Sequence, residues 1–159
     1  MTNSDLDEEK LLTAPLGSLL TFRISRLNSQ LNAQANRLLD ATAGLTLTQW
    51  RIFALIDLLG PIPAAEIVRR SNSDKAQISR TVARMLADGL LEAAPNRADQ
   101  RSTVLSMTPL GRATVDKART AMRQRQQRLL GAMTEAEQAT LFACFDKLDS
   151  VIADMEDEA

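Results

Sequence analysis

The segment that most restricts the fold is PNRADQRSTVLSMT, residues 95–108, in a chain that is otherwise patterned as helices. Its first eight residues are polar or small, and they lead into a short alternating run that is typical of a strand. Together with LLEAAP at residues 90–95, this pattern predicts two short strands joined by a charged loop. Thr108, followed by proline, then opens another helix. A fold for this chain must therefore place one charged hairpin among several helices.

Apolar residues at helical spacing predict long helices near both ends of the chain. After an acidic tail that we expect to be disordered, residues 1–14, a helix is expected from Pro15 to Gly44, where glycine suits the C-terminal cap. The last helix should begin after Thr134, which forms a capping box with Glu137. Its apolar residues step by four and three, as in a helix that packs along another helix. They are Leu141, Phe145, Leu148, Ile152 and Met155.

Caps and helix breakers divide residues 45–112 into shorter elements. One helix is expected with Thr48 as its N-cap, and a short helix follows from Pro63. The next helix is expected to have Ser73 as its N-cap and to end at Gly89. The hairpin follows directly, so this part of the chain contains two short helices, a turn, a third helix and two strands.

The helix after Ser73 has one apolar and one polar face. Ile78, Val82 and Met85 fall on one side at about 100° per residue, and the other side carries basic and amide groups. A helix that enters the major groove needs such a face, since its donors must reach base edges and phosphates. The alternative is an ordinary solvated face. The candidate DNA contacts on this helix are Ser73, Lys75, Gln77, Ser79, Arg80 and Arg84.

This order of elements predicts a winged helix-turn-helix over residues 45–112, flanked by long helices at 15–44 and 113–157. The predicted fold class is thus mainly α with a small β-wing.

The net charge of −1 conceals an uneven distribution. Residues 1–10 carry four acids and one lysine, and residues 135–159 carry eight acids and one lysine. Residues 61–112 carry eight basic side chains against five acidic ones, and residues 113–134 carry five against one. Because phosphates repel carboxylates, the basic middle of the chain should face a duplex and the acidic ends should lie away from it.

The residue types present argue against catalysis. The chain has no histidine, no tyrosine and one cysteine, which excludes a histidine base, a histidine-ligated metal and an internal disulfide. No acidic pair stands out from the solvated faces. We therefore expect a binding protein rather than an enzyme, with no metal and no cofactor, and a packing role for Cys144.

No apolar run approaches the roughly 18–20 residues of a membrane span. The N-terminus is acidic, unlike a signal or transit peptide. The expected location is the cytoplasm, with no membrane partner.

These motifs resemble the MarR family of bacterial transcriptional regulators, over about residues 16–156. DQRSTVLSMTPLGR, residues 99–112, is similar to the family's wing signature of Asp-x-Arg, a strand and Leu-Thr-x-x-Gly, with Met107 at the leucine position. SDKAQISRTVARMLADGLL, residues 73–91, is similar to the family's recognition helix and its exit into the wing.

The resemblance implies a homodimer in which residues 15–44 and 113–157 of both subunits interleave. Leu20 and Ile24 would lie in this interface, together with the apolar residues of the last helix. Two-fold symmetry then predicts an inverted-repeat operator in double-stranded DNA, with half-sites about 34–36 Å apart.

The resemblance also implies that Arg101 enters the minor groove and that Asp99 holds its guanidinium in place. A guanidinium suits a narrow, electronegative groove, and a carboxylate can fix it by a bidentate bond. The alternative is an exposed ion pair in a turn. Arg97 is a further candidate that contacts either a phosphate or nothing.

Many members of the family release DNA when a small molecule binds between the dimerisation helices and the DNA-binding lobe. The resemblance points to Phe22, Arg23, Trp50 and Phe53 as effector contacts, although Trp50 also suits a core position and Arg23 a surface one. The predicted function is a homodimeric repressor released by an aromatic acid, a phenol or an acyl-CoA. The alternative is a winged-helix protein-interaction module without specific DNA binding, which the basic helix face disfavours.

Overall fold

The computed structural model describes residues 15–71, 74–96 and 103–158. The chain divides into two compact units, one ending at Ala118 and the other beginning at Arg119. The first unit contains the sheet and the short helices, and the second is mostly helical over its described residues.

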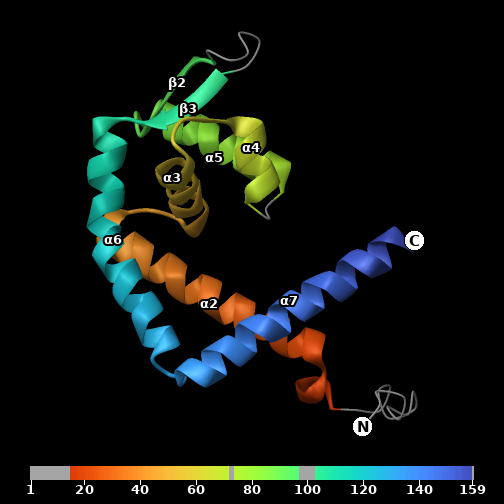
Figure 1. The fold of residues 1–159 in the computed structure, drawn as a ribbon. Coiled ribbons are helices and arrows are strands. Elements are labelled where there is room, and N and C mark those ends of the chain that lie inside the picture. The colour runs from red at the N-terminus through yellow and green to blue at the C-terminus, as the bar shows by residue number, and fades with distance from the viewer. Residues whose placement is uncertain (1–14, 72–73, 97–102, 159) are drawn as a thin grey trace. The chain divides into compact units, whose positions relative to one another are not determined.

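The first long helix, α2 (Leu20–Ala43), follows a single 3-10 turn at Leu16–Ser18 (Figure 1). It begins later than expected, because both Pro15 and Leu19 have extended backbone angles that interrupt a continuous helix. It ends as predicted at Gly44, whose φ of 64° places it in the left-handed region that favours glycine.

Four short elements follow in the first unit, and two of their starts differ from the prediction. They are α3 (Leu47–Leu59), β1 (Ile62–Pro63), α4 (Ala64–Arg70) and α5 (Lys75–Ala87). Thr46, not Thr48, caps α3, because its hydroxyl accepts the Gln49 N–H while the Gln49 side chain accepts the Thr46 N–H. Asp74, not Ser73, caps α5, because its carboxylate accepts a backbone N–H three residues later at 2.9 Å.

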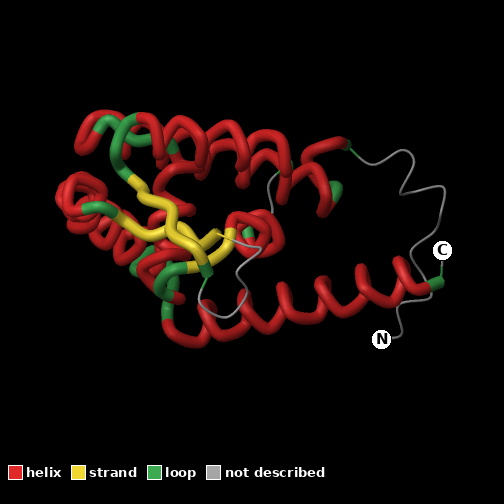
Figure 2. The backbone as a smooth tube through the Cα atoms, turned by 90° about the horizontal axis from the view of Figure 1, so that it is seen from above, coloured by secondary structure: helices red, strands yellow, loops and turns green. Residues whose placement is uncertain are grey.

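The predicted hairpin is present as β2 (Leu91–Pro95) and β3 (Thr103–Met107). The strand β1 pairs with the other edge of β3, so the sheet is antiparallel with the order β1-β3-β2, drawn in yellow in Figure 2. Leu105 in the central strand is opposite both Ile62 and Ala93. The sequence predicted β1 only as an extended piece, because two residues are too few to show strand alternation.

One apolar core holds the helices and the sheet of the first unit together. The largest side chains buried in it come from α2, α3, α4 and α5. They are Leu39, Ile52, Phe53, Ile67, Ile78 and Met85.

The helix α6 (Pro109–Leu130) begins at the predicted Thr-Pro step, where the Thr108 hydroxyl accepts the Gly111 N–H at 3.0 Å. A Cβ atom on Gly111 would lie 2.0 Å from the Leu90 carbonyl oxygen and 3.2 Å from a ring carbon of Phe53. Glycine at this position therefore allows α6 to start directly against the entry to the hairpin.

In the second unit, α7 (Glu135–Asp157) begins at the predicted capping box and has no buried residue. Of its predicted apolar stripe, Leu141 and Leu148 are half-buried and the other three side chains are exposed. Cys144 is exposed as well, so its predicted role as a buried packing residue is wrong for the single chain. The reason is that even the side of α7 that carries Leu141 and Leu148 is only half-buried in the single chain.

Replacing Gly111 with alanine tests the close contact at the start of α6. The added methyl group must displace backbone, so Gly111→Ala is expected to lower the free energy of unfolding by about 1–3 kcal/mol. Urea denaturation followed by circular dichroism measures the change. Gly17→Ala is the matched control, since nothing lies within 4 Å of a Cβ atom there. Equal unfolding midpoints for the two variants would contradict this account.

The capping box of α7 predicts a pH-dependent contribution to stability. The Thr134 backbone N–H and hydroxyl donate to the Glu137 carboxylate at 2.8 and 2.9 Å, which lowers the pKa of Glu137 below its usual value. Because the folded pKa is lowered, the contribution is present above the unfolded pKa of about 4.3 and is lost as the pH falls through the folded value.

Glu137→Gln should therefore lower the melting temperature more at about pH 7 than at a pH below the lowered folded pKa, where both states bind the proton. Glu156→Gln, at the other end of the same helix, is the control. A melting-temperature difference for Glu137→Gln that stays the same at both pH values would rule out this role of the carboxylate.

Candidate nucleic-acid interface

The helix α5 is oriented by its apolar face. Ile78, Val82 and Met85 are 1%, 7% and 0% exposed, and α5 packs against α3, α4 and β2. Because these residues recur every three or four positions, the opposite side of α5 must face solvent.

The outward side of α5 carries most of the predicted DNA contacts. All five predicted residues within this helix are exposed, namely Lys75, Gln77, Ser79, Arg80 and Arg84. Arg84 lies 3.7 Å from Asp88 in an exposed pair, which competes only weakly with a phosphate. Ser73 lies outside the described residues. Gln77, Arg80 and Arg84 thus share one outward side of the helix, and Lys75 and Ser79 are exposed near its start.

Gln77 is held at three points. Its backbone N–H donates to Asp74 at 2.9 Å, and its backbone carbonyl accepts the Thr81 hydroxyl at 2.8 Å. Its side-chain nitrogen donates to the Thr48 hydroxyl at 3.3 Å. The sequence did not reveal this last contact, because the two residues are 29 positions apart and no local pattern links them.

The hairpin follows α5 immediately, with Pro95 paired to Thr103 at the end of the two strands. A further contact holds the strands together, since the Ser106 hydroxyl lies 3.1 Å from the Glu92 carboxylate. The three predicted wing residues follow β2 in the sequence but lie outside the described residues, and they remain predictions. They are Arg97, Asp99 and Arg101.

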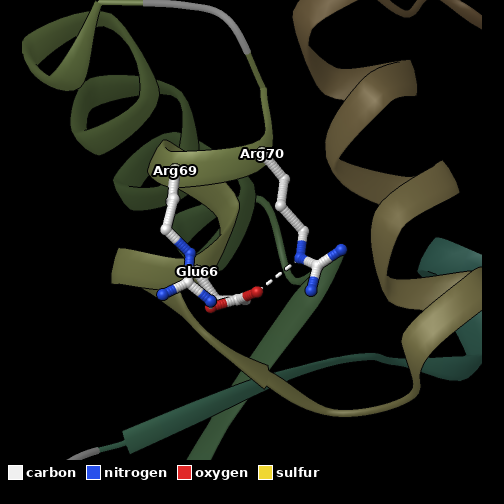
Figure 3. A network of polar contacts seen from close by, with 3 residues as sticks. All are labelled: Glu66, Arg69 and Arg70. Atoms are coloured by element: carbon white, nitrogen blue, oxygen red, sulfur yellow. Dashed lines mark hydrogen bonds and ion pairs between the residues drawn. The ribbon is translucent and has the colours of Figure 1, made fainter. Parts of the chain in front are cut away.

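The charges at the end of α4 are paired within the helix. The Glu66 carboxylate accepts hydrogen bonds from both Arg70 and Arg69, as Figure 3 shows. Both bonds lower the pKa of Glu66 below its usual value, and the bond from Arg70 has the larger effect. Two of the basic residues of the middle segment are thus partly neutralised, so α5 is the more available cationic surface.

An open cavity of about 660 Å³ lies in the first unit, between α2, α3 and the end of α4. Its polar residues include Asn32 and Arg51, whose guanidinium donates to the Asn32 side-chain oxygen at 3.1 Å. Its lining residues are Asn28, Asn32, Arg51, Ala54, Leu55, Leu58, Arg70 and Ser71. Such a wall combines cations, amides and an apolar side.

The four predicted effector residues are not among those that line this cavity. Phe22 and Arg23 are exposed on α2, Trp50 is half-buried, and Phe53 is fully buried in the core. The cavity could not be predicted from the sequence, because its lining comes from three helices that meet only in the folded unit.

Neither a metal site nor a membrane span is found in the described ranges. No three histidine, cysteine, aspartate or glutamate side chains there are grouped so that they could hold a metal ion. No helix in the same ranges has the length and apolarity to cross a membrane.

Known proteins resemble this chain in sequence. A family model described as MarR family matches residues 43–102, which contain the helix-turn-helix and the start of the wing. The HTH-type transcriptional repressor IacR of Pseudomonas putida is 26% identical over 116 residues, which cover 73% of this chain and 69% of the relative. The multiple antibiotic resistance protein MarR of Salmonella typhimurium is 29% identical over 122 residues, which cover 74% of this chain and 85% of the relative.

The same family is found by comparison of structures. A crystal structure of a mutant MarR from E. coli, complexed with operator DNA, superposes with a TM-score of 0.65 and 25% identity. The alignment covers 82% of this chain and 99% of that one. With the hairpin and the exposed donor face of α5, these matches show that the chain belongs to the MarR family and is a DNA-binding transcriptional regulator of the winged helix-turn-helix type.

Proposed function

We propose that this regulator is a homodimeric repressor that binds an inverted-repeat operator and is released by a small anionic ligand. The observation that carries the DNA-binding part is the one-sided α5, buried through Ile78, Val82 and Met85 and exposed through its donors. That one relative is named a transcriptional repressor supports the direction of regulation.

The recognition helix α5 enters the major groove in this proposal. Gln77 suits a bidentate contact with adenine, and Arg80 and Arg84 suit guanine or phosphate. Lys75 and Ser79, near the start of the helix, bind the phosphate backbone and set the position of the helix, with Ser73 as a further contact from the sequence.

The hairpin acts as the wing beside the minor groove. The two paired strands β2 and β3 form a narrow support for the residues that follow Asn96. On the basis of the sequence signature, Arg101 enters the groove, Asp99 fixes its guanidinium, and Arg97 contacts a phosphate.

A second copy of the chain covers the apolar surfaces of α2 and α7, within residues 15–44 and 113–157. On α2, Leu20 and Ile24 are 55% and 41% exposed. On α7, Phe145, Ile152 and Met155 are 41%, 53% and 64% exposed. Exposed apolar surface on this scale is typical of an interface, and a closed two-fold dimer supplies two recognition helices for an inverted repeat.

The cavity beside α2 and α3 is the proposed effector site. Arg51 supplies positive charge, and Arg70 adds a guanidinium that is already paired with Glu66. Asn28 and Asn32 supply amide groups, and Leu55 belongs to an apolar side. This combination suits an amphipathic anion such as an aromatic acid, and the volume lies within the usual range for small-ligand pockets. Phenols and acyl-CoA thioesters are the other ligand classes to compare.

Arg80→Ala tests the DNA interface. Loss of a base or phosphate contact should weaken binding to a duplex, selected from a random pool with the wild-type protein, by about 1–3 kcal/mol at matched salt. Fluorescence polarisation measures the affinity. Arg37→Ala removes the same charge from an exposed position on α2 and should have little effect. If Arg80→Ala and Arg37→Ala lost the same amount of affinity, the total charge of the protein, and not the α5 surface, would govern binding.

The wild-type titrations should also be repeated at several salt concentrations, because phosphate contacts make affinity fall as salt rises. A wild-type protein that bound no duplex in this salt-dependent way would favour the protein-interaction module instead.

Arg51→Met tests the effector site, with benzoate as the anionic probe and benzamide as its neutral isostere. Benzoate should raise the melting temperature of the wild-type protein and weaken its binding to the selected duplex, and benzamide should do neither. At a concentration of 100 times Kd, such a ligand adds about 2.7 kcal/mol to the free energy of unfolding. Arg51→Met should lose both effects.

Arg26→Met, on an exposed part of α2, is the matched control and should respond to benzoate as the wild type does. If Arg51→Met still responded fully, the anion would bind elsewhere.

A further inference from the structure

We propose that Thr48 is a specificity-determining residue, which positions the Gln77 carboxamide for reading one base pair. This inference rests on the proposed function, in which Gln77 contacts a base edge. Thr48 does not itself touch DNA in this scheme. It acts through the hydrogen bond that joins α3 to the recognition helix.

The contacts around Gln77 fix the residue from its backbone to the end of its side chain. Asp74 accepts its N–H and Thr81 donates to its carbonyl, so the main chain is held on both sides. Most long polar side chains on an exposed helix face are free to rotate beyond the backbone. The Gln77 side chain differs, because its terminal nitrogen lies 3.3 Å from the Thr48 hydroxyl.

Thr48 is able to hold this position because α3 is anchored and Thr48 is not used as its cap. Thr46 and Gln49 form the capping box of α3. Ile52 and Phe53, on the same helix, are both 0% exposed. The Thr48 hydroxyl is therefore carried by a helix that is fixed in the core of the first unit.

The chemistry of a carboxamide explains why this contact matters for base recognition. Glutamine has one acceptor oxygen and two N–H donors. One N–H binds Thr48, which leaves the oxygen and the second N–H, the pair that adenine requires at N6 and N7. A held side chain also loses less rotamer freedom on binding, and the cost avoided corresponds to roughly 2- to 10-fold in affinity.

A purely structural tie between α3 and α5 would stabilise the fold without affecting one base pair in particular. The two roles are separated by measuring base discrimination together with stability. Affinities are determined by fluorescence polarisation for the selected duplex and for each single base-pair substitution in one half-site. The proteins compared are the wild type, Thr48→Val, Thr48→Ser, Gln77→Ala and Thr140→Val, and each melting temperature is recorded.

The wild type should discriminate strongly at one A·T pair that Gln77→Ala no longer distinguishes. Thr48→Val should reduce discrimination at that same pair by roughly 2- to 10-fold and leave the other positions unchanged. Thr48→Ser keeps the hydroxyl and should restore the wild-type preference. Thr140→Val makes the same substitution on α7, where the hydroxyl donates to the Ala136 carbonyl of its own helix, and should change nothing.

Two results would overturn the inference while leaving the proposed function intact. One is a Thr48→Val protein that discriminates like the wild type at the pair lost in Gln77→Ala. The other is a Thr48→Val protein that loses the same amount of affinity for every duplex and has a lower melting temperature. That result would show that Thr48 only stabilises the packing of α3 against α5. If Thr48→Val does not fold, Thr48→Ala and Thr48→Ser carry the same comparison.

A different pattern would locate the error in the proposed function. If Gln77→Ala kept every base preference of the wild type, the proposed contact of Gln77 with a base would be wrong, and the role of Thr48 would fall with it.

Discussion

The interface depends on the burial of one side of α5. Ile78, Val82 and Met85 fill the space between α3, α4 and the hairpin, so the helix can present only its other face to solvent. Burying three such side chains contributes about 1.5–3 kcal/mol each, far more than a surface ion pair such as that of Arg84 with Asp88. The packing therefore fixes the orientation of the helix, and the polar residues follow from it.

The position of the hairpin relative to α5 depends on a second close contact. The Thr108 hydroxyl donates to the Gly89 carbonyl at 2.6 Å and accepts the Gly111 N–H at 3.0 Å. One side chain thus joins the end of the recognition helix to the start of α6, and both strands of the wing lie between these points in the sequence. Because Gly111 has no side chain, this junction closes without displacing Leu90 or Phe53.

Local patterns predicted the elements, and tertiary contacts determined what the patterns missed. Gly44 and the capping box of Thr134 have near neighbours as partners, so the sequence was sufficient for them. Thr46 also has a local signal, since Gln49 follows it three residues later in a capping-box pattern that Thr48 lacks. The contact of Thr48 with Gln77 had no local signal, and neither had the cavity. The exposure of Cys144 follows from the open face of α7, which a periodic pattern alone does not reveal.

A ligand can release DNA only if it binds the DNA-competent and incompetent conformations with different affinities. The helix α3 connects the cavity with the recognition helix, because Arg51 lines the cavity and Thr48 contacts Gln77. These two residues are three positions apart, which places them on neighbouring parts of one helix surface. An anion that competes with Asn32 for Arg51 would therefore act on the same helix that holds Gln77. Because Ile52 and Phe53 are buried, α3 would respond to such an anion as one packed element, which is how a change at Arg51 would reach Thr48.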